Sequence, residues 1–394
     1  MQLAANQSQP QPQPDQPYVD RKRYFWLLSL TNPSLAASGP FLYLLTDKVI
    51  SLWWPVLLMY LLFPLFDFIV GADRSNPPES AVPALEADLY YRWITYLLVP
   101  LLWAGYLYGI IFFATHDLPW HAKLAGMLAC GLVGGNAINL GHELGHKKTK
   151  LERWLARIIL ALTCYGHFYV EHNRGHHRDV ATFDDPASSR MGESIYRFML
   201  REVPGAFVRA WQLERERLAR EGRSVFSWRN EIFAPMLLSL LVYGGLTLWL
   251  GWPAFIMICG ATFFSYFQLT AANYVEHYGL LRQKLPNGRY EVCTPQHSWS
   301  SNQLLSNWAV LHLQRHADHH AYPARRFQSL RHFDEAPLLP TGYFGVFTLS
   351  YFPPLWFWVM DRYLIKVVEG DASLINFDPR KREKLIAKYQ LKNG

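Results

Sequence analysis

The chain has 394 residues, 51% of them hydrophobic and 15% aromatic, and its formal net charge is +7. Its four cysteines form no C-x-x-C pair, which excludes a thiolate iron–sulfur site and a disulfide framework. The basic charge admits nucleic-acid binding, but long apolar runs between basic stretches are better explained by a membrane protein with a positive cytoplasmic face. We therefore predict contact with membrane lipid and no nucleic-acid partner.

The chain begins with a stretch that is rich in Gln and Pro and lacks an apolar core. Residues 1–20 are therefore predicted to be a disordered tail and not a secretory signal peptide. The membrane-embedded domain should cover residues 21–378, and the basic residues 379–394 should form a solvated cytoplasmic tail.

A membrane-spanning helix needs about 20 predominantly apolar residues. Six stretches meet this need, so we predict an all-α integral membrane protein with spans at about 24–46, 50–71, 93–115, 121–141, 233–251 and 253–276. Pro33 and Pro40 weaken the first span. The second carries Asp67, an intramembrane carboxylate that is costly unless a polar partner lies nearby.

Short linkers with few basic residues join pairs of these spans, whereas the longer segments are strongly basic. The positive-inside rule then places both termini and the long loops in the cytoplasm. Residues 151–171 are predicted to form a buried helix beside the membrane, and 205–222 a charged cytoplasmic helix. Residues 343–363 are aromatic-rich and should lie in the membrane interface.

Histidines are the main chemical signal of the sequence. Eight of the fifteen fall into three clusters: His142 and His146; His172, His176 and His177; and His316, His319 and His320. Histidines three or four positions apart share a helix face, about 5–6 Å from each other. The first cluster begins where the fourth span ends, and His277 has the same place at the end of the sixth. Four separate elements should therefore meet at one cytoplasmic-side cavity.

Nine histidines are too many for a single ion. Zinc normally takes four ligands, and imidazole also suits iron, copper and nickel. Two iron ions with four or five nitrogens each, and room for O₂, fit this number best. Buried histidines without a metal would leave many ring nitrogens unsatisfied.

An alternative comes from His142-Glu143-x-x-His146, which matches the H-E-x-x-H signature of zinc metalloproteases. In such a protease Glu143 would be the general base. That chemistry needs only one further ligand, so the second and third clusters would have no role.

Four carboxylates are sequence neighbours of cluster histidines: Glu143, Glu171, Glu276 and Asp318. Adjacent side chains on a helix point about 100° apart, so these groups are predicted to orient the rings or balance the charge of the site, and not to bind metal directly. His167 and His312 lie close to the clusters and are further candidates for this supporting role.

At these residues the sequence resembles the bacterial membrane-bound alkane 1-monooxygenases. The matching segments are NLGHELGHK at 139–147, YGHFYVEHNRGHHRDVAT at 165–182, DPASSRMGESIYRF at 185–198, NYVEHYGLLRQK at 273–284 and LQRHADHHAYPARRFQSLR at 313–331. Membrane fatty-acid desaturases and hydroxylases share the broad histidine spacing but not the flanking residues. They are the second alternative.

The resemblance implies that the nine histidines named above bind two irons in a bacterial cytoplasmic (inner) membrane protein. It implies terminal hydroxylation of straight-chain, medium-chain alkanes to primary alcohols, with O₂ and two electrons from reduced rubredoxin. Some family members carry a fused rubredoxin domain. We expect rubredoxin here to be a separate partner, or a fusion domain that has been removed.

An alkane concentrates in the bilayer because burying each CH₂ gains about 0.8 kcal/mol. We expect an apolar channel between helices, and Trp53, Trp54 and Met59 of the second span are candidates to cap it. An interfacial aromatic belt explains the tryptophans equally well.

The electron donor is expected to be acidic. Basic residues that are candidates to steer its docking are Lys147, Lys148, Arg178, Arg325 and Arg326, although positive-inside bias alone would also place them there.

Overall fold

The computed structural model describes residues 18–392, in which extended segments meet only at isolated β-bridges. The prediction of an all-α protein is therefore confirmed for this part of the chain. Five helices are long and apolar enough to cross a membrane: Val49–Val70, Leu89–Thr115, Trp120–Gly145, Phe233–Leu250 and Trp252–His277. They correspond to the second to sixth predicted spans. Residues 1–17 of the predicted N-terminal tail lie outside the described range.

The first predicted span, 24–46, is helical but is not among these five. It consists of a 3-10 helix, η1 (Phe25–Ser34), followed by α1 (Leu35–Thr46). Pro33 and Pro40 have no backbone N–H, so a continuous α-helical ladder is not available here. Asn32 points into the bundle and donates to the carbonyl of Ala309 at 2.7 Å. A sixth crossing by this segment stays a prediction.

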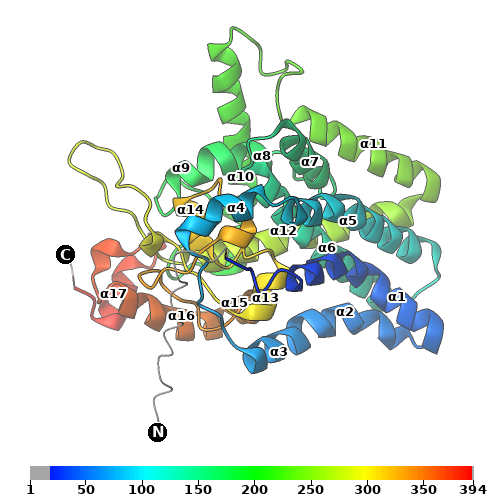
Figure 1. The fold of residues 1–394 in the computed structure, drawn as a ribbon, viewed down its shortest axis with the longest axis horizontal. Helices are drawn as coiled ribbons and strands as arrows, with labels where there is room; N and C mark the ends of the chain where they lie inside the picture. Colours follow the sequence, from blue (N-terminus) through cyan, green and yellow to red (C-terminus); the bar gives the residue numbers. More distant parts are fainter. Residues whose placement is uncertain (1–17, 393–394) are drawn as a thin grey trace.

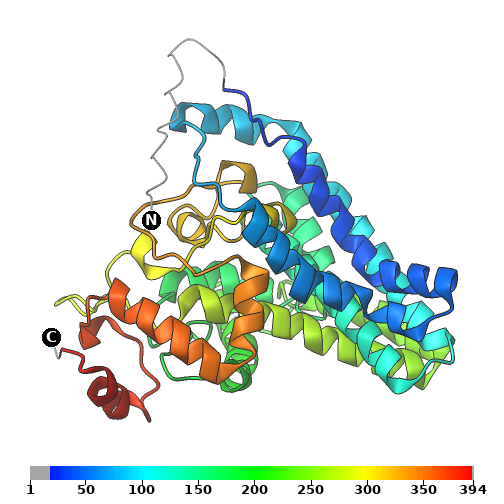
Figure 2. The same cartoon turned by 90° about the horizontal axis from the view of Figure 1, so that it is seen from below.

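The helix over Val49–Val70 is built of short pieces. These are η2 (Val49–Trp53), α2 (Trp54–Leu57), the π-helical η3 (Leu58–Leu62) and α3 (Phe63–Val70). Figure 2 shows this helix and α1 on the same flank of the bundle.

Two helices form the centre of the bundle, α6 (Trp120–Gly145) and α12 (Trp252–His277), with α5 (Leu89–Thr115) beside them (Figure 1). Small residues on α6 allow their close approach. A Cβ added at Gly131 would lie 2.6 Å from the Phe264 ring, and one at Gly135 would lie 2.8 Å from Cβ of Gln268. Because α6 and α12 both end at histidines, this close pair carries the site at one end of the bundle.

At the periphery, α11 (Phe233–Leu250) exposes leucines along its outer face, including Leu240, Leu241 and Leu248. Figure 1 shows it along the edge of the molecule. An apolar face without protein neighbours is what a lipid-facing helix presents.

Other helices cover the histidine end of the bundle. They are α4 (Val82–Ala87), α7 (Lys150–Ala161), α8 (Phe168–Glu171), η5 (His172–His176), α9 (His177–Asp179), α10 (Ile195–Arg220), α13 (Leu304–Ala309), α14 (His316–Ala321), α15 (Tyr343–Ser350), α16 (Pro353–Val367) and α17 (Arg382–Tyr389). The predicted charged helix at 205–222 is the second half of α10. The predicted helix at 151–171 is interrupted after Ala161, where Cys164 adopts a left-handed φ of 54°.

The C-terminal segment differs from the solvated tail that was predicted for 379–394. Its helix α17 packs on the domain because Leu385 and Leu391 are buried, and Tyr389 donates to the carboxylate of Asp361 at 2.8 Å. Apolar residues spaced along this basic stretch give it a buried side.

Asp67 has the polar partner that its position in the second span requires. Its carboxylate accepts hydrogen bonds from both the backbone N–H and the hydroxyl of Ser306, in the first turns of α13. A carboxylate at a helix N-terminus satisfies donors that have no partner within the helix. Asp67 thereby ties α3 to the segment that leads to His316.

Candidate metal centre

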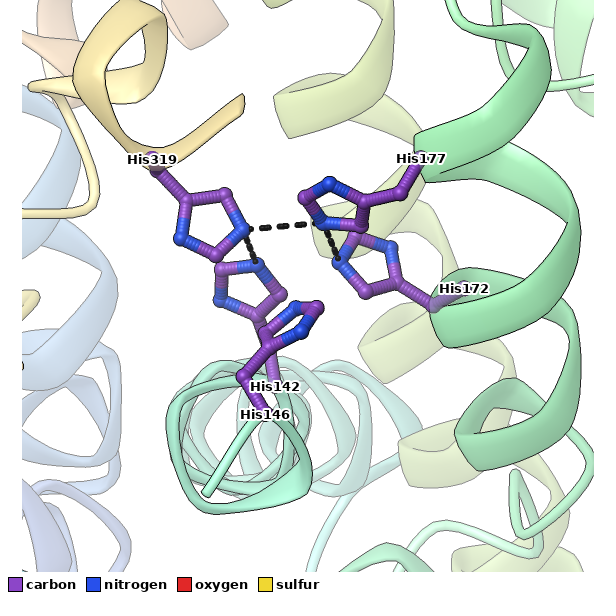
Figure 3. A group of neighbouring side chains, drawn as sticks. All are labelled: His142, His146, His172, His177 and His319. Carbon is purple, nitrogen blue, oxygen red and sulfur yellow. Dashed lines mark hydrogen bonds between the residues drawn. The ribbon is translucent and has the colours of Figure 1, made fainter. Parts of the chain in front are cut away.

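The structure brings all nine predicted histidines together in two adjoining groups. The first contains His142, His146, His172, His177 and His319, and the second contains His176, His277, His316 and His320. Within each group, one nitrogen of every ring lies within 4.8 Å of those of the others. Figure 3 shows the five rings of the first group pointing toward one another from three separate elements. The rings of His177 and His320, one from each group, are 4.5 Å apart.

Local helix geometry decides which histidine joins which group. His142 and His146 lie one turn apart at the end of α6, as their spacing predicts. The next cluster lies in a π-helical turn, η5, where five residues complete roughly one turn. His172 and His177 therefore face the same group, and His176 faces the other. The pairing of His172 with His176 that an α-helix would give is not the one observed.

The third cluster also divides differently from the expectation. On α14, His316 and His320 are four positions apart and share the second group, while His319 turns to the first. The prediction that His316 and His319 would share a face is therefore wrong. A four-residue spacing aligns side chains more closely than a three-residue spacing on a helix with 3.6 residues per turn.

The donor atoms fit metal ions. Nε2 of His142 lies 2.7 Å from Nε2 of His319, and Nε2 of His177 lies 3.0 Å from Nε2 of His172. In the second group, Nε2 of His316 lies 3.2 Å from Nε2 of His277 and 2.9 Å from Nε2 of His320. A neutral imidazole has one N–H donor and one lone pair. Several buried ring nitrogens, among them Nε2 of His146 and of His176, have no hydrogen-bond partner. Lone pairs that converge on a point suit metal–nitrogen bonds of about 2.0–2.1 Å.

Burial keeps most of these rings neutral. It lowers the pKa of His172, His177 and His319 well below the usual value, and neighbouring rings lower it further. Neutral rings present lone pairs without first releasing a proton. His176 is different: burial acts to lower its pKa, but the carboxylate of Asp185 outweighs burial and raises it.

Asp185 is a site residue that the sequence analysis missed. Its carboxylate lies 2.9 Å from Nδ1 of His176 and accepts a hydrogen bond from the hydroxyl of Ser188 at 2.7 Å. A carboxylate on one ring nitrogen fixes the orientation of the ring and leaves the other nitrogen for a metal. Only its place in the DPASS segment could have suggested it, because the search was confined to sequence neighbours of histidines.

Of the four predicted supporting carboxylates, Glu276 contacts a histidine of the two groups. Its carboxylate lies 3.3 Å from Nε2 of His316 and accepts a hydrogen bond from the Tyr343 hydroxyl at 2.6 Å. The other three face cations: Glu143 pairs with Lys147, Glu171 with Arg209, and Asp318 with Arg325. Side chains adjacent to a ligand on a helix point away from it, which explains this outcome.

The two extra histidine candidates lie outside the groups. His167 packs on Tyr165 and Phe207. His312 shares a hydrogen bond with the carbonyl of Phe327 and stacks edge-on to Trp26. Both therefore serve packing.

Glu143 is also poorly placed for the protease alternative. Its carboxylate lies 3.0 Å from Nζ of Lys147 and accepts the backbone N–H of Phe327 at 3.2 Å. Its acceptor capacity is thus directed away from the histidines, whereas a general base must reach metal-bound water.

A narrow cavity of about 60 Å³ opens between α6, α12 and α15 and reaches both histidine groups. Its walls are mostly apolar, with a few amide side chains. The lining residues that matter most below are His142, His172, His316, Leu132, Gln268, Glu276 and Phe347.

The predicted channel residues do not line this cavity. Trp53 and Trp54 border a separate apolar groove with Leu42 and Leu57, and Met59 is buried in the core. On a helix, only one face can meet a given cavity, and this stretch turns that face elsewhere.

The predicted docking residues also divide. Lys147 and Arg326 are buried and paired with Glu143 and Glu152, so they present little charge to a partner. Arg325 is partly buried and paired with Asp318. Lys148 and Arg178 are exposed, although Arg178 pairs with Asp179.

Comparison with known proteins identifies the class. The fatty acid desaturase family model matches residues 118–350, so the helical fold and the histidine groups are those of a histidine-rich membrane oxidoreductase. Alkane 1-monooxygenase 1 of Alcanivorax borkumensis is 49% identical over 379 residues, which cover 96% of this chain and 93% of that protein. Alkane 1-monooxygenase of Ectopseudomonas oleovorans is 47% identical, with 94% and 93% covered. The xylene/toluene monooxygenase hydroxylase component of Pseudomonas putida is 28% identical, with 66% and 70% covered.

The chain belongs to the alkane 1-monooxygenase family, as its histidine segments predicted. It is accordingly an oxidoreductase of the monooxygenase type.

Proposed function

We propose that this protein hydroxylates the terminal carbon of medium-chain n-alkanes to primary alcohols at a di-iron centre held by its nine histidines. The observation that carries this proposal is the apolar cavity, which ends at histidines of both groups: His142 and His172 from one, His316 from the other. The overall reaction takes one alkane, O₂, two electrons and two protons, and yields one alcohol and one water.

The chain's own residues bind and orient the substrate. The walls of the cavity exclude water and hold the alkane, whose methyl end faces the histidines. When bound, two irons would supply the activation of O₂. Five nitrogens would hold one and four the other, and the carboxylates of Asp185 and Glu276 keep the rings of His176 and His316 in position.

The surroundings follow from this assignment. We infer a bacterial inner-membrane protein with six crossings, and with both termini and the metal centre on the cytoplasmic side, which the distribution of basic residues supports. Reduced rubredoxin is the proposed electron donor, and Lys148 and Arg178 are the exposed members of the basic set proposed to guide it.

The direct test is metal analysis combined with turnover. The purified protein should contain about two irons per chain, and with octane, O₂ and reduced rubredoxin it should form 1-octanol. A single zinc with O₂-independent peptide cleavage would instead support the protease alternative. An alkene formed from an acyl substrate would support a desaturase.

A further inference from the structure

The cavity has a far end that is defined by two helices. On α6 its lining runs from His142 back to Leu132, which is about 15 Å along a helix that rises 1.5 Å per residue. On α12 the lining runs from Glu276 back to Gln268, about 12 Å. Because both helices end at the histidines, Leu132 and Gln268 lie at the end of the cavity farthest from the metal centre.

Gln268 belongs to a hydrogen-bonded triad at that end. The hydroxyl of Tyr60, from η3, donates to Oε1 of Gln268 at 2.9 Å. Nε2 of Gln268 donates to the hydroxyl of Tyr351, just after α15, at 3.2 Å. The two hydroxyl oxygens are 3.3 Å apart. Three segments that are distant in the sequence are thus joined by polar groups in an otherwise apolar region.

We propose that the triad of Gln268, Tyr60 and Tyr351 is the end wall of the substrate cavity and sets the longest alkane that the enzyme accepts. This inference rests on the proposed alkane hydroxylation and adds its determinant of chain length.

The hydrogen bonds make this wall stiff. To move Gln268 aside, a substrate would have to break bonds whose partners are then buried without replacement, and an unpaired buried polar group is costly. An alkane offers neither a donor nor an acceptor in exchange. On the opposite side, α6 backs the stem of Gln268, since a Cβ at Gly135 would lie 2.8 Å from Cβ of Gln268.

Chain length follows from this stiffness. With its methyl end at the histidines, an alkane extends toward the triad, and each CH₂ that leaves water or lipid for a well-packed wall adds binding free energy. Once the chain reaches the triad, a further CH₂ forces the chain to bend or moves its methyl group out of place. We therefore expect kcat/KM to fall sharply beyond one length.

The test compares kcat/KM for an alkane series from hexane to hexadecane in the rubredoxin-coupled holoenzyme. Gln268→Ala removes the wall and should move the cut-off to longer chains. Beyond the wild-type cut-off, the variant should exceed the wild type by about fourfold for each additional CH₂ that the enlarged cavity buries. The double variant Tyr60→Phe/Tyr351→Phe keeps the ring volume but removes the hydrogen bonds, and it should move the cut-off in the same direction by less. Tyr108→Phe, on an exposed residue of α5, is the matched control.

Alkane binding gives a readout that does not depend on turnover. The longest alkane that raises the Tm of the wild type should be shorter than the longest one that raises the Tm of Gln268→Ala. If Gln268→Ala loses its metal, the double tyrosine variant and its binding profile decide the question.

Three outcomes separate the possible results. An unchanged length profile in variants that retain metal would overturn the wall. An equal rise for every chain length would also overturn it, because the triad would then control entry. A wild-type enzyme that forms no alcohol from any alkane would refute the proposed function instead.

Discussion

The π-helical turn at His172–His176 shows how much depends on single residues in this site. In a regular α-helix His172 and His176 would face the same way, but the wider turn pairs His172 with His177 instead. One extra residue in the turn thereby supplies ligands to both groups from one short segment.

Removing one histidine should disable one half of the centre. His319→Ala takes a nitrogen from the group of five, and His320→Ala takes one from the group of four. Each variant should bind less than two irons per chain and lose at least about 100-fold in alcohol formation, because a lost ligand costs more than the 10–100-fold typical of its supporting partners. Iron analysis and gas chromatography of the product measure this, with the exposed His116→Ala as control. Full iron content in His319→Ala would contradict the assignment.

A buried carboxylate outside the spans, Glu202 on α10, should make stability depend on pH. Burial raises its pKa to about 7, although Thr270 and Asn273 donate hydrogen bonds to it. An unfolded Glu titrates near 4.3. Between these values the folded state binds more protons than the unfolded state, so stability falls as pH rises, by up to about 1.4 kcal/mol per pH unit.

Glu202→Gln removes this titration. Its Tm should change less than that of the wild type between about pH 4.5 and about pH 7, and above that range it should be the more stable protein. Parallel Tm–pH curves for the two proteins would show that Glu202 does not titrate in this range.

At the scale of elements, the tie between α3 and α13 holds the third histidine segment in place. Asp67→Ala leaves the N–H and hydroxyl of Ser306 without their acceptor, and each unsatisfied buried donor costs about 1–3 kcal/mol. We expect a clearly lower Tm, with Asp67→Asn retaining part of the stability because its amide oxygen still accepts one bond.

Thermal unfolding in detergent checks this prediction, with the exposed Asp47→Ala as control. An unchanged Tm in Asp67→Ala would mean that α13 is held by packing alone.

For the whole molecule, the charge distribution predicts a salt-dependent encounter with the electron donor. At subsaturating rubredoxin, turnover should fall as ionic strength rises, because exposed charges are screened beyond about 10 Å at 0.1 M salt. Lys148→Glu and Arg178→Glu should weaken the salt dependence, and a Lys147→Ala variant should not do so through docking because Lys147 is buried. Turnover that is independent of salt would remove electrostatic guidance.

The sequence alone determined the helical membrane character, the extent of five long apolar helices, the nine histidines and the family. These follow from patterns that are local: apolar length, helix spacing and the residues that flank each histidine. The tertiary structure decided the division of the rings into five and four, the role of Asp185, the partners of Asp67 and the lining of the cavity. Each of these depends on contacts between segments far apart in the chain, and on one helical turn of unusual width, which local patterns do not encode.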